Sequence, residues 1–528
     1  MGPRAAGCRR LRGTLLALTA AGAVLLTGCS ASSGDNSSNS ADKSGGRNLP
    51  LPAPAQPSGG AAEGERQGEQ TGAPDRELAP SPDYLSTFAL DVDTASYGYA
   101  RRTLANGRIP DPSTIRPEEF VNSFRQTYER PDGNGFSVTV DGARTDDERW
   151  SLVRVGLATR AAESDRERPP AALTFVIDVS GSMDEPGRLD LAKDSLDVMT
   201  DRLRDDDSVA LVTFSDDAET VLPMTRLGDH RGRVHDAIDS LEPQDSTNLG
   251  AGVDTGYDTA VEGRREGATN RVVLISDALA NTGDTDADSI LERISSARSR
   301  HGITLFGVGV GSDYGDALME RLADKGDGHT TYVSNEDDAR KVFCEQLPQN
   351  IDLTARDAKA QVAFDPQTVE QFRLIGYDNR KVADEDFRDD RVDGGEVGPG
   401  HTVTALYAVR TKPGASGHLA TASVRWLDPD SRAPHEESGQ LETAALHDDL
   451  WTSPTTFQVA AVAAHFADAL RADDARWSST LPGALPLDEL AARARTLAKT
   501  SEDEAVGGLA TAVEQASRMD NCEVGCSG

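Results

Sequence analysis

Aromatic residues and cysteines are both scarce in this sequence of 528 residues. Aromatic residues make up 5% of the chain, and its five cysteines are spread unevenly, at Cys8, Cys29, Cys344, Cys522 and Cys526. No CxxC pair or histidine cluster accompanies them, which argues against a zinc site and against a scaffold held together by disulfides. Outside the cytosol, two pairings stay open for the later cysteines: Cys522 with Cys526, or one of these with Cys344.

Positive charge is also in deficit. Lysine and arginine number 54 against 88 aspartate and glutamate residues, so the formal net charge is -34. An acidic chain repels nucleic acid, so we expect no nucleic-acid partner; the same charge suits a secreted, well-solvated protein or one that binds cations. Apolar residues still make up 37% of the sequence, which at this length is enough for two to four domains with sizeable cores.

Common catalytic motifs are missing. No HExxH, GxSxG or Walker-type loop occurs, and the scattered histidines His230, His235, His301 and His329 are typical of surface or core-packing positions. We therefore expect a protein that is not an enzyme.

The apolar run near the N-terminus, residues 15–26, is too short to span a bilayer comfortably. Four arginines precede this run, and "LTGC" at 26–29 ends it, which closely resembles the lipobox of bacterial lipoproteins. The resemblance implies a signal peptide of residues 1–28, cleavage before Cys29 and a diacylglyceryl group on the Cys29 thiol. We expect the acylated Cys29 to anchor the protein in the cell membrane, facing outside the cytoplasm.

The composition changes several times along the mature chain. Residues 29–80 consist mostly of Ser, Gly, Pro and charged residues, which predicts a disordered tether. An N-terminal α+β module is expected at 81–170, a β-rich module at 351–448 and a helical region at 449–528. Between them, at 171–350, apolar strands alternate with amphipathic helices, which predicts an α/β domain with a doubly wound, mainly parallel sheet.

Side chains with oxygen atoms gather at the expected strand ends of this α/β domain. "TFVIDVSGSMD" at 174–184 follows a buried strand, "DSTNLGAG" at 245–252 opens a helix, and "LISDA" at 274–278 ends a second buried strand. Open parallel sheets place ligands beyond the carboxyl ends of their strands, and a hard cation such as Mg²⁺ prefers oxygen ligands. The three segments supply five candidate donors: Asp178, Ser180, Ser182, Thr247 and Asp277.

In this order and context the five residues closely resemble the metal-ion-dependent adhesion site of von Willebrand factor type A (VWA) domains. The resemblance covers residues 171–347 and departs at Ala278, where many members have glycine. It implies that Ser180, Ser182 and Thr247 bind the cation directly and that the two aspartates act largely through water. The implied cofactor is Mg²⁺, with Mn²⁺ or Ca²⁺ as alternatives. The implied ligand is a protein that supplies an Asp or Glu carboxylate.

Most of residues 84–520 resemble a narrower group, the YfbK-like VWA lipoproteins of bacteria. The resemblance rests on the segment at 86–97, on the VWA domain and on the C-terminal helices at 453–519. This narrower resemblance implies an architecture and not a cellular role, and the adhesion-site motif is what favours cation-dependent protein binding as the function. One alternative is a metal-free envelope scaffold that binds through its β-rich and helical modules.

A near twin of the first site segment, "TFALDVDTASY" at 87–97, raises an enzymatic alternative. Asp91 and Asp93 resemble the DxDxT opening of haloacid dehalogenase-type phosphatases. However, Ala95 stands where that motif needs Thr or Val, and only two helices follow within forty residues. We favour a structural strand–turn–helix in which Asp91, Asp93 and Ser96 make turn and cap bonds.

Overall fold

The computed structural model describes most of the chain beyond residue 82. The described residues are 83–90, 93–146, 149–161, 168–277, 287–310, 322, 329–333, 335–343, 347, 351, 353–392, 394–429, 431–472, 480–501 and 503–526. The chain divides into two units, Met1–Pro74 and Asp75–Gly528, and every described residue belongs to the second. The expected signal peptide, Cys29, the tether and the disulfide pairings of Cys344, Cys522 and Cys526 lie outside what the structure describes.

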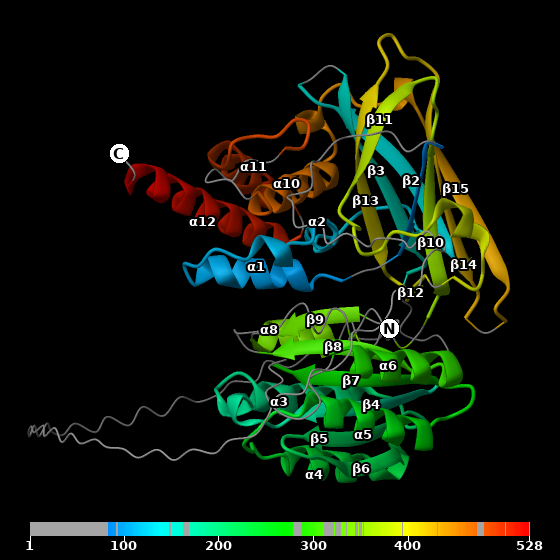
Figure 1. The fold of residues 1–528 in the computed structure, drawn as a ribbon, viewed down its shortest axis with the longest axis vertical. Coiled ribbons are helices and arrows are strands. Elements are labelled where there is room, and N and C mark those ends of the chain that lie inside the picture. Colours follow the sequence, from blue (N-terminus) through cyan, green and yellow to red (C-terminus); the bar gives the residue numbers. More distant parts are fainter. Residues whose placement is uncertain are drawn as a thin grey trace, which may run out of the picture. The chain divides into compact units, whose positions relative to one another are not determined.

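The α/β domain is built on a six-stranded sheet with the strand order β6-β5-β4-β7-β8-β9 (Figure 1). All neighbouring strands are parallel except β6, which runs antiparallel to β5. The predicted mainly parallel sheet is confirmed. The elements are β4 (Ala171–Asp178), α3 (Leu189–Arg202), β5 (Ser208–Phe214), β6 (Ala218–Arg226), α4 (Arg231–Asp239), α5 (Leu249–Glu262), β7 (Thr269–Ser276), α6 (Ala287–His301), β8 (Thr304–Val310), β9 (His329–Val333) and α8 (Glu336–Lys341).

Helices cover both faces of this sheet. Every residue of β4 and β7 is buried, as continuous apolar strands require in the centre of a doubly covered sheet. One core cluster joins the sheet to α3, α4 and α8, and a second joins it to α5 and α6. Helix α5 lies very close to the sheet because Gly252 and Gly256 face it. A Cβ at these positions would lie 2.6 Å from Phe214 and 2.3 Å from Val176.

The remaining strands form two antiparallel sheets. One has the order β1-β10-β14-β15, with β12 paired to β10, and the other has the order β11-β13-β3-β2. Apolar side chains from both sheets, such as Phe88, Val155 and Trp426, share one buried core, so the two sheets form a sandwich. The strands are β1 (Leu85–Ala89), β2 (Phe136–Arg144), β3 (Trp150–Thr159), β10 (Ala355–Phe364), β11 (Val369–Ile375), β12 (Gly395–Val397), β13 (Thr402–Thr411), β14 (His418–Leu427) and β15 (Pro434–Glu442).

The sandwich takes strands from both sides of the α/β domain. The sequence predicts separate modules at 81–170 and 351–448, whereas in the structure β1 pairs with β10 and β3 pairs with β13 along most of their lengths. The α/β domain is therefore inserted, in chain order, between strands β3 and β10 of one sandwich. Alternating apolar residues identify a strand but not its partner, so the two halves look independent in the sequence.

Helices from the two ends of the chain share a third layer. The helices α1 (Ala95–Ala105) and α2 (Pro117–Asn122) pack with α10 (Thr455–Leu470), α11 (Leu487–Thr500) and α12 (Ala505–Cys526) in one apolar cluster (Figure 1). This cluster also includes Leu152, Leu406 and Ala408 from the four-stranded sheet. Among the described residues, no helix combines the length and the apolar character that a membrane span requires.

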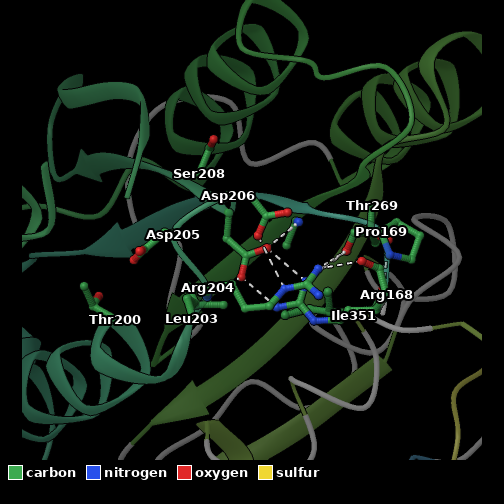
Figure 2. Close-up of polar contacts among 12 residues, drawn as sticks. Arg168, Pro169, Thr200, Leu203, Arg204, Asp205, Asp206, Ser208, Thr269 and Ile351 are labelled. Carbon is green, nitrogen blue, oxygen red and sulfur yellow. Dashed lines mark hydrogen bonds and ion pairs between the residues drawn. The ribbon is translucent and has the colours of Figure 1, made fainter. Parts of the chain in front are cut away.

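A buried carboxylate ties together the amino ends of β4 and β5. Asp207 accepts hydrogen bonds from the two terminal nitrogens of Arg168, at 2.9 and 2.6 Å, and from the backbone N–H groups of Ala171 and Arg204, at 2.8 and 2.7 Å. Figure 2 shows Arg168 and Arg204 in this network, beside Ile351, a residue near the C-terminal end of the α/β domain. Burial raises the pKa of Asp207, but the hydrogen bonds from Arg168 and the backbone outweigh it, so the pKa lies below its usual range.

A second buried carboxylate, Glu118 in the first turn of α2, has the opposite electrostatics. Burial raises its pKa to about 7, and Oε2 has no hydrogen-bond partner in the described part of the chain. The folded protein therefore holds this proton more tightly than the unfolded chain, and stability falls as the pH rises from about 4.5 to about 7. At pH 8, Glu118→Gln is expected to raise the free energy of unfolding by about 1–3 kcal/mol, because the amide is neutral.

Urea unfolding at pH 4.5 and pH 8 measures this effect. The gain from Glu118→Gln should be small at pH 4.5, where the carboxyl group of the folded protein is already protonated. Glu119→Gln is the control. The Glu119 carboxylate accepts a hydrogen bond from the backbone N–H of Ser96 at 2.8 Å, so removing its charge should bring no comparable gain in the free energy of unfolding. An equal effect of Glu118→Gln at both pH values would contradict a charged, buried Glu118.

Candidate functional site

The candidate residues lie at the carboxyl edge of the six-stranded sheet. Asp178 is the last residue of β4, and Asp277 directly follows β7, the parallel neighbour of β4. Ile177 and Ile275 are register partners, so Asp178 comes one residue after this pair on its strand and Asp277 comes two residues after it on the neighbouring strand. Both are almost completely buried, at 0% and 1% exposure.

Backbone hydrogen bonds join the loop after β4 to the loop that carries Thr247. The N–H of Gln244 donates to the carbonyl oxygen of Val179 at 2.6 Å, and the N–H of Gly181 donates to Asp245 at 2.9 Å. A Cβ at position 181 would lie 3.2 Å from the Asp245 carbonyl oxygen, so glycine allows this close approach. Thr247 is buried one residue before Asn248, whose side chain caps the N-terminus of α5. The serine loop and the threonine loop are therefore held against each other.

The Asp178 carboxylate organises the serine loop. Its Oδ1 accepts a hydrogen bond from the N–H of Ser180 at 2.9 Å, and its Oδ2 accepts one from the hydroxyl of Ser276 at 2.6 Å. Beyond it, the hydroxyl oxygens of Ser180 and Ser182 lie 3.1 Å apart. Burial raises the pKa of Asp178, the hydrogen bonds from Ser180 and Ser276 oppose this rise, and the charge of Asp277 adds to it.

The two carboxylate oxygens of Asp277 have different surroundings. Its Oδ2 accepts a hydrogen bond from Nη1 of the buried Arg188 at 2.7 Å. Its Oδ1 is buried and has no hydrogen-bond partner among the described residues. A buried carboxylate oxygen without a hydrogen-bond partner costs free energy unless a cation or a water molecule satisfies it.

The donor set is suited to a hard divalent cation. It combines hydroxyl groups with two carboxylates, and the described residues contain no group of three His, Cys, Asp or Glu side chains able to hold a metal. All five candidate side chains offer oxygen donors, which suit Mg²⁺, Mn²⁺ or Ca²⁺ better than soft or nitrogen-preferring metals. Together with the unpartnered Oδ1 of Asp277, this chemistry is compatible with a cation at the candidate site.

The twin segment has a different environment. Asp91 lies outside the described residues, and Asp93 forms an ion pair with Arg380 at 3.4 Å. Ser96 fastens the following loop, since its hydroxyl donates to the Thr114 carbonyl oxygen at 2.6 Å and accepts from the Arg116 N–H at 2.9 Å. The capping position of α1 is occupied by Thr94, whose side chain makes no cap bond. These contacts support a structural role for the segment, with tertiary bonds in place of the expected caps at Asp93 and Ser96.

Sequence reasoning missed two residues that contact the candidate aspartates. Ser276 directly precedes Asp277, and a hydroxyl at the end of a buried strand was a usable signal. Arg188 lies ten residues beyond Asp178 in a polar stretch, and nothing in that stretch indicated that its side chain would be buried against Asp277.

Known families match most of the chain in three stretches. The model of the von Willebrand factor type A domain matches residues 172–345, the model of the C-terminal region of YfbK matches residues 350–505, and a further von Willebrand factor model matches residues 73–153. The chain is thus a VWA-domain protein. VWA domains commonly mediate interactions between proteins, and many hold a divalent cation.

Relatives narrow this class. The chain is 37% identical over 344 residues to YfbK of Escherichia coli (strain K12), a match that covers 63% of this chain and 59% of the relative. It is 27% identical over 205 residues to the sll0103 protein of Synechocystis, covering 38% of this chain and 47% of that protein. It is a YfbK-like VWA-domain protein, and it spans less than two thirds of the length of either relative.

The chain is also similar to a solved structure. The match to the von Willebrand factor type A protein from Catenulispora acidiphila has a TM-score of 0.42 and 16% identity, and covers 64% of this chain and 79% of that one.

Proposed function

We propose that the VWA domain binds a protein ligand through a divalent cation, and that the chain does so as an acylated lipoprotein outside the cytoplasm, without catalysis. One observation carries the cation site: the buried Oδ1 of Asp277 has no hydrogen-bond partner in the described part of the chain, and Arg188 links this aspartate to the serine loop, where two hydroxyls lie 3.1 Å apart. Ser180, Ser182 and Thr247 would hold the cation, with Asp178 and Asp277 behind them. Mg²⁺ is the expected ion, and Mn²⁺ or Ca²⁺ share its preference for oxygen.

The ligand is expected to supply a carboxylate. A cation held mainly by neutral hydroxyl groups keeps most of its charge, so a free coordination position attracts an anionic oxygen. An aspartate or glutamate side chain of a partner protein has this chemistry. The residues of this chain would position the ion and shield it from bulk solvent, since four of the five are almost fully buried: Asp178, Ser180, Thr247 and Asp277.

The direct test is a pull-down from envelope extract with the purified protein, in Mg²⁺ and in EDTA. Thr247→Ala removes one proposed ligand, so recovery of the partner should fall about tenfold or more. Thr255→Ala, at a half-buried position on α5, is the matched control and should leave recovery unchanged. Equal recovery in Mg²⁺ and EDTA would refute the cation mechanism and favour the metal-free scaffold alternative.

The membrane anchor has its own test. The lipobox motif at 26–29 supports acylation of Cys29, and the long tether would then allow the folded part to stand away from the membrane. Cys29→Ala is expected to move the protein from the detergent phase to the aqueous phase in a phase-partition assay. Cys8→Ala, within the proposed signal peptide, is the control. A Cys29→Ala variant that still enters the detergent phase would require another anchor.

A further inference from the structure

Arg188 is a buried cation at the edge of the candidate site. It occupies the N-terminal capping position of α3, and its side chain is 5% exposed. Nη1 donates to Oδ2 of Asp277 at 2.7 Å and to the carbonyl oxygen of Ser182 at 2.8 Å. Nη2 lies 2.8 Å from a carboxylate oxygen of Glu185, whose side chain is 67% exposed. One guanidinium group thus contacts both the aspartate after β7 and the serine loop after β4.

The charge of Arg188 changes the electrostatics of the whole site. The buried carboxylates of Asp178 and Asp277 carry two negative charges when ionised, and Arg188 cancels one of them. Glu185 contributes little because its charge is exposed and screened. A divalent cation therefore leaves the cluster with one positive charge, whereas the same carboxylates without Arg188 would leave it neutral. Buried charges are weakly screened, so this single charge matters at each binding step.

We infer that Arg188 lowers the affinity of the site for the cation and raises the affinity of the cation-loaded site for a carboxylate. The inference rests on the proposed function and deepens it. Repulsion between the guanidinium and the cation opposes the first step. The positive charge that remains after loading favours the second step, the arrival of an anionic group.

A purely structural role for Arg188 leads to a different expectation. Its two hydrogen bonds at the site fix the Asp277 carboxylate and the backbone of Ser182. If positioning were the whole effect, loss of the side chain would disorder the donors and weaken both the cation and the carboxylate. The two roles therefore differ in the sign of the change in cation affinity.

The experiment compares the unaltered protein with Arg188→Met and Arg188→Lys at pH 7.5. Calorimetry with Mn²⁺ alone measures cation affinity, and the Mn²⁺-induced relaxation of acetate protons measures carboxylate binding to the loaded protein. We expect Arg188→Met to bind Mn²⁺ about tenfold more tightly and acetate at least about threefold more weakly. Arg188→Lys keeps the charge and should stay near the unaltered protein in both measurements. Arg202→Met, at an exposed position on the last turn of α3, is the control for charge alone.

Each result decides a point. Tighter Mn²⁺ with weaker acetate in Arg188→Met supports the inference, whereas weaker or unchanged Mn²⁺ binding in a folded Arg188→Met variant overturns it. If Arg188→Met does not fold, Arg188→Lys and Arg188→Gln still separate charge from size, because only the glutamine variant should bind Mn²⁺ more tightly. A failure of the unaltered protein to bind Mn²⁺ would refute the cation site itself, and the inference with it.

Discussion

Asp178→Ala is expected to abolish measurable binding of Mg²⁺ and Mn²⁺ in calorimetry. The variant removes a carboxylate that holds the Ser180 N–H at 2.9 Å and the Ser276 hydroxyl at 2.6 Å, so the serine loop loses its fixed geometry as well as a negative charge. Mg²⁺ demands near-octahedral order and gives up its water reluctantly, so a loosened cage should bind it poorly. Folding should survive, because the substitution also relieves the cost of a charge buried next to Asp277.

Two variants make this result specific. Asp184→Ala removes an equal charge from an exposed position six residues further along the chain and should leave cation binding within about twofold of the unaltered protein. Asp93→Asn alters the twin segment, where the aspartate is paired with Arg380, and should also preserve cation binding. If Asp93→Asn loses the cation while Asp178→Ala retains it, the site lies in the twin segment and the assignment is wrong.

The α/β domain could be predicted closely from the sequence. Strands such as 171–178 and 269–276 are continuous apolar runs, helices with periodic apolar faces follow, and this alternation permits few topologies. The oxygen donors of the candidate site were predicted for the same reason, because strand ends in a parallel sheet meet at one edge.

The sandwich and the Arg188 contact could not be predicted in this way. Strand β1 pairs with β10 far along the chain, with Leu85 opposite Ala363, and no local pattern records which strand completes a sheet. Likewise, Arg188 reaches Asp277 across 89 positions, and a lone arginine is usually a surface residue. Both features are contacts between residues that lie far apart in the sequence. The apolar periodicity of a short segment carries no information about such contacts.

We expect the amino edge of the six-stranded sheet, where Asp207 lies, to stabilise the inserted α/β domain. Asp207→Ala is expected to lower the free energy of unfolding by about 3–5 kcal/mol, because Arg168 then remains largely buried without its partner and two backbone N–H groups lose their acceptor. Chemical unfolding of the full chain measures this loss. Asp206→Ala is the matched control: this neighbour is 39% exposed and lies 3.4 Å from Arg204, so its loss should cost less than about 1 kcal/mol.

The same variant separates stability from binding. Asp207 precedes β5 at the amino edge of the sheet, while Asp178 ends β4 at the carboxyl edge, and the seven-residue step from Ala171 to Asp178 corresponds to roughly 23 Å along a strand. Folded Asp207→Ala should therefore bind Mn²⁺ as tightly as the unaltered protein, whereas Asp178→Ala should lose the cation with little change in unfolding free energy. Weakened Mn²⁺ binding in a folded Asp207→Ala protein would show that the two edges are coupled through the sheet. It would contradict the expectation that cation binding at the carboxyl edge does not depend on Asp207.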